Sequence, residues 1–288
     1  MIVPTGQASA KPEAIDAPDA YARARRADIQ RWLEAPPDWG TRLLAKPSHV
    51  AARLTQQLVP VGVLRASLQA LDGVAGRIAG GRDILRWAGV DTLEALAQRS
   101  LREADALARR VERRAILLAG GSGAALGIGG AAGMVADIPT LLTLALRTIH
   151  RTAYCYGEDW GQPGAQGLSI GVFALASANS YEEKRAAWAA LHEGRPLLDA
   201  AWRDGVERIA ERELAKDAAQ FSLNTLASRI GAHLGTRKSG GALPVIGAVV
   251  GGAVNAGYIH DIAQAAQYTL AARCLRRMGL APDTGRGA

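Results

Sequence analysis

Apolar residues recur three and four positions apart through much of the chain, a spacing typical of helices that bury one face. A first helix is predicted after Asp16, with Pro18 in its first turn, and a less regular one over residues 61–79. Apolar and polar residues nowhere alternate convincingly with the period of two that marks a half-buried strand. The pattern therefore predicts an all-α fold.

Two patterns of the type D/S-x-x-E predict the starts of further helices, because the first and fourth side chains can cap each other's backbone N–H groups. Asp91 and Glu94 are expected to open a long charged helix that ends near Arg114. Ser180 and Glu183 are expected to open another. Additional helices are expected over residues 138–157, 168–178, 197–220, 225–235 and 262–279.

Two long stretches, residues 115–136 and 239–259, carry no charged residue and many glycines. The first is followed by Asp137, and the second by His260 and then Asp261. Setting Asp137 on Asp261 also aligns two glycines of one stretch with two of the other. We interpret the stretches as two Gly-rich helical hairpins that form a degenerate pseudo-repeat, and a chance match in Gly- and Ala-rich sequence is the alternative.

The glycines of these stretches need close packing to be tolerated, since each glycine inside a helix costs about 1 kcal/mol relative to alanine. Several stand four positions apart, the spacing at which small residues let two helix backbones touch. The expected packing glycines are Gly123, Gly127, Gly129, Gly133, Gly247 and Gly251. Three environments fit such stretches: a tightly packed protein core, a membrane span, or a hairpin inserted into one membrane surface.

The chain of 288 residues is long enough for a single domain with a sizeable core. Residues 19–280 are predicted to form that domain, with residues 1–18 and 281–288 as disordered tails. Hydrophobic residues make up 49% of the chain but aromatic residues only 5%, which favours helices packed at short distance. The two cysteines suit a reducing cytoplasm, and no secretory signal peptide is predicted.

The formal net charge of +7 favours attraction to a polyanion, although a solvated basic surface is equally common. The candidate contact for anionic lipid is the basic cluster, which comprises Arg109, Arg110, Arg113 and Arg114. Because acidic residues are interleaved with the arginines of this region, a solvated helix face competes with that interpretation. Six tryptophans, several of them near arginine, suit either a bilayer interface or the edge of a core. No nucleic-acid-binding module is recognisable, so nucleic acid is not an expected partner.

Short motifs offer little catalytic chemistry. Residues 167–171 match the G-x-S-x-G pattern of hydrolases around Ser169, but no strand is predicted before them, so a helix start is the preferred interpretation. Asp137, His260 and Asp261 are candidates for a buried polar site, while helix N-capping is the preferred role of the two aspartates. No catalytic residue, metal site or cofactor is predicted, because no ligand spacing is recognisable.

Both Gly-rich regions resemble the EcsC protein family. The run GIGGAAGMVADIPTLLTLALRTIHRTAYCYG is similar to the central part of that family, and LPVIGAVVGGAVNAGYIHDIAQAAQYTLAARCLRRMG to its C-terminal part. The runs RWLEAPP and LVPVGVLRASLQALDG also resemble its N-terminal half. The family is named for a protein encoded beside the ATPase and membrane subunits of an ABC transporter. The resemblance implies no catalytic residues, because none are established for the family.

From the residues and the resemblance together we expect a non-enzymatic cytoplasmic protein that associates peripherally with the inner face of the cytoplasmic membrane. Its expected partners are an anionic membrane surface or a transporter subunit, and a homo-oligomer is compatible with the sequence. The alternative hypothesis is a soluble enzyme or a small-molecule or metal-binding protein, with Asp137, His260 and Asp261 in a buried pocket.

Overall fold

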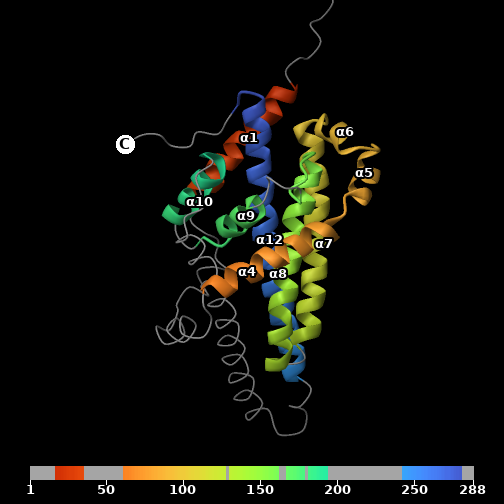
Figure 1. The fold of residues 1–288 in the computed structure, drawn as a ribbon, viewed down its shortest axis with the longest axis vertical. Coiled ribbons are helices and arrows are strands. Elements are labelled where there is room, and N and C mark those ends of the chain that lie inside the picture. The colour runs from red at the N-terminus through yellow and green to blue at the C-terminus, as the bar shows by residue number, and fades with distance from the viewer. Residues whose placement is uncertain are drawn as a thin grey trace, which may run out of the picture.

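The computed structural model describes residues 17–35, 61–127, 130–161, 167–178, 181–193 and 242–280. Within these ranges all regular structure is helical and no strand occurs, which confirms the predicted all-α class (Figure 1). The helices are α1 (Ala17–Glu34), α4 (Val61–Ala79), α5 (Arg82–Ala88), α6 (Leu93–Ala97), α7 (Leu101–Gly127), α8 (Gly130–Cys155), α9 (Leu168–Ala176), α10 (Tyr181–Glu193) and α12 (Ala242–Arg277).

Three long helices, α7, α8 and α12, lie side by side and form the centre of the fold (Figure 1). Their buried faces follow helical spacing: on α7 the buried positions include Ala104, Ala108, Val111, Ala115 and Ala119, and on α12 they include Ile259, Ile262, Ala266 and Leu270. The small residues of α7 let large residues of its neighbours approach the helix axis closely. The core therefore combines alanines of α7 and α12 with the larger side chains of α8 and α12.

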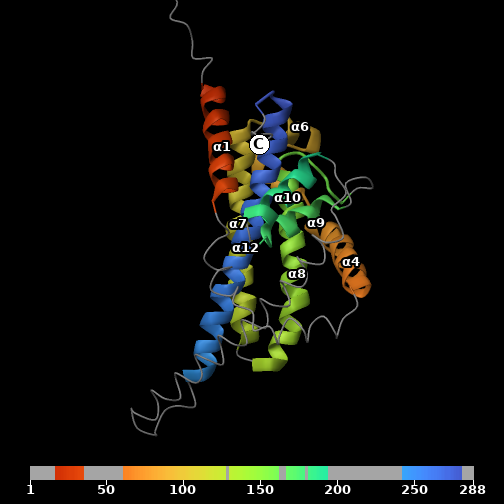
Figure 2. The same cartoon turned by 90° about the vertical axis from the view of Figure 1, so that its left-hand side faces the viewer.

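The shorter helices cover the sides of this bundle. Figure 2 shows α1 and α4 on opposite sides, with α1 against α12 and α4 against α8. The helices α9 and α10 pack against each other and on α12, while α5 and α6 lie at one end of α7. The three central helices and the shorter helices around them share one cluster of buried hydrophobic residues, so the described residues form one packed helical domain.

The charged helix expected from residue 92 is divided into two. Thr92, rather than Asp91, caps the short helix α6 by accepting a hydrogen bond from the backbone N–H of Ala95 at 3.2 Å. A new helix, α7, then begins after Ser100, whose hydroxyl accepts from Glu103 N–H at 3.3 Å while the Glu103 carboxylate accepts from Ser100 N–H at 3.0 Å. The effective capping box is therefore S-x-x-E at residues 100–103, where both reciprocal bonds form.

The helix junctions expected at the two aspartates are absent. Asp137 lies inside α8, which begins at Gly130, and Asp261 lies inside α12, which is continuous from Ala242 to Arg277. The prediction that these aspartates cap new helices was therefore wrong, because inside a helix the backbone N–H groups of the following residues are already bonded to carbonyls of the preceding turn. The first Gly-rich stretch contains the end of α7 at Gly127 and the start of α8 at Gly130. Whether the second belongs to a hairpin stays a prediction, since residues 194–241 lie outside the described ranges.

A contact between two glycines joins α7 and α12. A Cβ atom placed on Gly252 would lie 2.9 Å from the carbonyl oxygen of Gly120, so the two backbones touch there. Of the six glycines expected to pack, Gly123 is buried on α7 and Gly129 lies outside the described residues. The packing of Gly127, Gly133, Gly247 and Gly251 stays a prediction. In the described part of the chain, no helix combines the length and the apolar content required for crossing a membrane.

Candidate functional site

The basic cluster lies on the exposed side of α7, with all four arginines exposed to solvent. The guanidinium carbons of Arg110 and Arg114 each lie 4.3 Å from the centre of the Trp87 ring on α5. A guanidinium at this distance from an indole ring is attracted by the negative face of the ring. Trp87 therefore holds two of the four arginines in defined positions on the surface.

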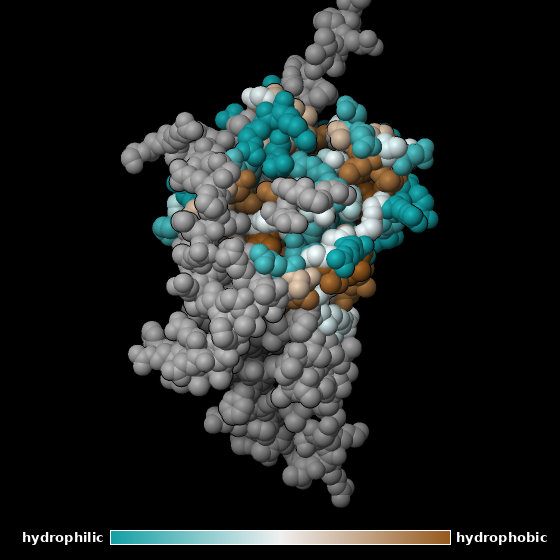
Figure 3. Space-filling view, viewed as in Figure 1, coloured by the Kyte–Doolittle hydropathy of each residue, from teal (hydrophilic) through white to brown (hydrophobic). Residues whose placement is uncertain are grey.

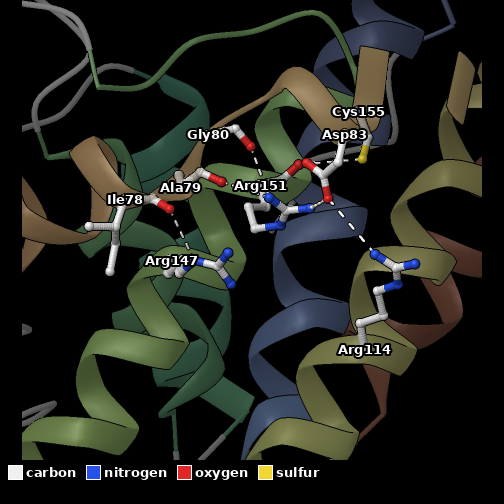
Figure 4. A network of polar contacts seen from close by, with 8 residues as sticks. All are labelled: Ile78, Ala79, Gly80, Asp83, Arg114, Arg147, Arg151 and Cys155. Atoms are coloured by element: carbon white, nitrogen blue, oxygen red, sulfur yellow. Dashed lines mark hydrogen bonds and ion pairs between the residues drawn. The ribbon is translucent and has the colours of Figure 1, made fainter. Parts of the chain in front are cut away.

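Another arginine, Arg151, lies where α4 ends (Figure 4). Arg151 of α8 donates to the carbonyl oxygens of Ala79 and Gly80 at 2.7 and 2.8 Å and to Asp83 at 2.5 Å. The hydrogen bond and charge of Arg151 hold the pKa of Asp83 below its ordinary value, although partial burial alone would raise it. Arg151 thus satisfies the last carbonyls of α4 and neutralises Asp83 at the same time.

Two carboxylates offset part of the charge of the basic cluster: Glu112 interacts with the charge of Arg109, and Asp83 lies near Arg114. Arg114 approaches Asp83 at 3.9 Å, and this is the only ion pair between the cluster and a described carboxylate. Asp83 is already engaged by Arg151, so its charge is largely balanced before Arg114 is counted. The outer side of α7 therefore presents net positive charge to solvent.

The same side of α7 becomes apolar one turn further along the helix. Leu117 and Leu118 are 75% and 56% exposed. They stand four residues after Arg113 and Arg114, and residues four apart share a helix face. Figure 3 shows hydrophobic surface in brown beside α7 at the lower end of the coloured surface, with hydrophilic surface above it.

The polar site predicted around His260 forms with different partners. His260 on α12 bonds through Nδ1 to the Glu112 carboxylate on α7 at 2.7 Å, and Gln267 donates to the other oxygen of Glu112 at 2.7 Å. Burial alone would raise the pKa of Glu112, but the hydrogen bonds from His260 and Gln267 hold it below its ordinary value. Asp261 is half-buried, and the side chain of Asp137 lies outside the described ones. The convergence of Asp137, His260 and Asp261 thus stays a prediction.

Asp105 was not predicted as a functional or structural site, yet it is the most deeply buried carboxylate of α7. Its oxygens accept hydrogen bonds from the hydroxyls of Tyr21 and Tyr156, and Arg25 forms an ion pair with it at 3.0 Å. Burial, followed by the charge of Asp105, raises the pKa of Tyr156 well above its ordinary value. This network joins α1 to the bundle.

Two acidic residues of α7, the buried Asp105 and the half-buried Glu112, could have been detected in the sequence. Asp105 and Glu112 are seven residues apart, and both fall among the alanines of the buried stripe. Acidic residues on an apolar helix stripe indicate buried partners, because an unpaired buried charge is very costly. The identities of those partners come from helices far away in the sequence and had no local signal.

The hydrolase-like motif is part of a helix, as expected. Ser169 lies in the first turn of α9, after Gly167 in the left-handed conformation at φ 94°. Its hydroxyl is buried and makes no hydrogen bond to any described group. A serine nucleophile needs a base within hydrogen-bond reach. His150, the histidine of the neighbouring helix α8, is instead bound through Nε2 to Asp72 at 2.8 Å. Among the described residues, no cluster of three metal-ligating side chains occurs.

The fold and these sites define an all-α protein with a glycine-rich helical centre, an alanine-lined seam between α7 and α12, and a basic outer surface. The sequence profile of the EcsC protein family matches residues 23–275, most of the chain. The chain therefore belongs to the EcsC protein family. Comparison with curated proteins and with solved structures yields no match.

Proposed function

We propose that this protein is a non-enzymatic, peripheral membrane protein that binds anionic lipid through the basic cluster, at the inner face of the cytoplasmic membrane. The observation that carries the proposal is the exposure of four arginines within two turns of α7, with Asp83 as their one described ion-pair partner. Anionic headgroups supply the missing negative charge. Each arginine near such a surface contributes about 1 kcal/mol of binding free energy.

Trp87 adds a second reason for a membrane surface. Tryptophan is favoured at the boundary between headgroups and hydrocarbon, where its ring is apolar and its N–H can reach water or lipid. Here the ring is half-buried and lies beside Arg110 and Arg114. A surface that combines arginine with tryptophan is suited to a phosphate-bearing interface.

We further propose that the protein acts as an accessory to a membrane transporter of the ABC type. The support is its membership of the EcsC family, whose name derives from a protein encoded beside the subunits of such a transporter. This is an association between genes rather than a contact between proteins. Co-purification of the transporter subunits with the full-length protein, lost in a variant that lacks membrane binding, would be the expected outcome.

The lipid proposal is tested by co-sedimentation with vesicles of phosphatidylglycerol and phosphatidylcholine, against phosphatidylcholine alone. We expect binding to the anionic vesicles that weakens as salt is raised, because salt screens exposed charges. The double variant R109Q/R113Q removes two charges and leaves the Arg110–Trp87–Arg114 contacts in place. At about 1 kcal/mol for each arginine it should bind roughly 30-fold more weakly.

The matched control is R23Q/R26Q, which removes two exposed arginines from α1. This control should lower binding by no more than a few-fold, because Arg23 and Arg26 lie on α1 and do not belong to the basic cluster, although Tyr21 of α1 contacts Arg109. Equal losses in the two double variants would contradict a specific basic cluster. Binding that is equally strong to neutral vesicles, or absent from both kinds, would contradict the proposed function itself.

A further inference from the structure

We propose that the charge-free end of the α7–α8–α12 bundle inserts shallowly into one leaflet of an anionic bilayer, with the exposed Leu117 and Leu118 at the boundary between headgroups and hydrocarbon. The inference rests on the proposed function and adds the element that enters the lipid. It begins where the basic cluster ends, so that headgroup contact and insertion belong to the same helix.

The first support is the order of side chains on the outer side of α7. Arg113 is followed four residues later by Leu117, and Arg114 by Leu118, so each arginine shares a helix face with an exposed leucine. Isolated exposed leucines are ordinary on protein surfaces. Two adjacent leucines directly beyond four arginines and a tryptophan match the order of a membrane interface, where charge meets headgroups and apolar side chains meet hydrocarbon.

The second support is the absence of charge from the neighbouring helix segments. Residues 115–127 of α7, 130–136 of α8 and 242–259 of α12 contain no charged residue. Both views show these segments at the same end of the bundle (Figures 1 and 2). The segment of α7 beyond Arg114 is about 20 Å long at 1.5 Å per residue. On α8 the charge-free segment is shorter, about 10 Å before Asp137, so the depth free of charge is less than the roughly 15 Å of hydrocarbon in one leaflet, as shallow insertion requires.

The third support is charge complementarity, which favours a bilayer over a second copy of the chain. A symmetric dimer formed through Leu117 and Leu118 would place the same surface patch of both subunits face to face. The two basic clusters would then lie close together and repel each other. An anionic bilayer instead offers negative charge beside an apolar layer, which matches the order of residues on α7.

The experiment uses an environment-sensitive fluorophore attached at position 118. The full-length variant C274S/L118C has a single reactive thiol, because burial raises the pKa of Cys155 to about 12 and encloses it. The matched control carries the label at position 23 on α1, in C274S/R23C. We expect vesicles that contain phosphatidylglycerol and spin-labelled lipid to quench the label at position 118 and to leave the label at position 23 unquenched.

A second, unlabelled variant tests the leucines directly. L117Q/L118Q changes two exposed side chains, so the fold should be preserved, and M278Q is the control at another exposed apolar residue. We expect L117Q/L118Q to keep its binding at low salt and to lose the fraction that resists high salt. M278Q should keep both.

The outcomes separate this inference from the proposed function. Salt-sensitive binding to anionic vesicles without quenching at position 118 would overturn the insertion while the peripheral function stands. Absence of binding to any vesicle would overturn both. A shift from dimer to monomer in L117Q/L118Q, measured by sedimentation without lipid, would overturn the insertion in favour of a second copy of the chain.

Discussion

Gly252 of α12 lies so close to Gly120 of α7 that a side chain on Gly252 would collide with the backbone of α7. A Cβ atom on Gly252 would lie 2.9 Å from the Gly120 carbonyl oxygen and 3.5 Å from the Cβ of Ala124. Backbone atoms cannot move aside as the end of a flexible side chain can. This contact therefore fixes the distance between the two helices that share the longest seam of the fold.

The first prediction concerns this contact. We expect Gly252→Ala to lower the thermal midpoint of unfolding, because the strain of separating α7 from α12 exceeds the roughly 1 kcal/mol that alanine gains in a helix. The matched control is Gly121→Ala, at a neighbouring helical glycine with open space around it. That variant should be at least as stable as the parent. Thermal unfolding followed by circular dichroism compares them, and an increase in stability for both would contradict the contact.

The second prediction concerns Asp105. Replacing it with Asn removes the charge that balances Arg25 and leaves only one side-chain oxygen for the two tyrosine hydroxyls. We expect a loss of about 3–5 kcal/mol in the free energy of unfolding, the usual cost of breaking a buried ion pair. The variant Tyr21→Phe, which removes one hydroxyl donor, should cost only about 1–2 kcal/mol. Urea unfolding measures both, and equal effects would show that the charge of Asp105 is unimportant.

Much of the fold could be predicted from local patterns. The helix over residues 61–79 has the predicted bounds, and the first helix begins after Asp16 as expected. The wrong predictions concern where helices begin, at positions where two sequence features favour different starts. Thr92 displaced Asp91 as the cap of α6, and the α-helices run through Asp137 and Asp261 because packing along the bundle outweighs the glycines before them.

For the candidate sites, the contacts between helices were what the sequence could not predict. The exposure of the basic cluster could be expected from the charged side of an amphipathic helix. The association of Arg110 and Arg114 with Trp87, and of His260 with Glu112, could not, because these partners come from other helices. Contacts of this kind depend on how helices cross, and a single sequence carries no direct record of that.

The third prediction is a dependence of stability on pH through His192. Its ring stacks on Trp188 with centroids 4.0 Å apart, and Nδ1 donates to the Trp188 carbonyl at 2.9 Å. Burial first, and then the charges of Arg276 and Arg273, lower the pKa of His192 from 6.5 to about 4. Between pH 6.5 and about pH 4, His192 binds a proton in the unfolded chain but stays neutral in the folded chain. Stability should therefore fall as the pH drops from 6.5 towards 4, by about 3 kcal/mol in all.

Urea unfolding at pH 7, 6 and 5 measures this effect before most carboxylates titrate. The variant His192→Phe keeps an aromatic ring against Trp188 and has no proton to gain. It should be less stable than the parent at pH 7, because a hydrogen bond is lost, yet its stability should change much less between pH 7 and pH 5. A parallel decline in both proteins would mean that His192 is not the titrating group.

The last prediction concerns Arg151, which holds the end of α4 and the start of α5 against α8 (Figure 4). Arg151→Met removes donors from the carbonyls of Ala79 and Gly80 and from Asp83. Hydrogen bonds to charged groups contribute about 1.5–3 kcal/mol, so local opening of this region should become roughly tenfold more frequent or greater. The buried Cys155 reports on that opening, since burial raises its pKa to about 12 and suppresses its reaction in the closed state.

The measurement is the rate at which a thiol reagent labels Cys155 in native conditions, in a background of C274S. The matched control is Arg147→Met, because Arg147 is a half-buried arginine one turn earlier on α8 that donates to Ile78 of α4 at 3.2 Å. Arg147 bonds no carboxylate within hydrogen-bond distance among the described residues, so its loss should accelerate labelling far less. Equal acceleration by the two variants would show that general loosening of α4, rather than the bonds of Arg151 to Asp83 and the last carbonyls, controls access to Cys155.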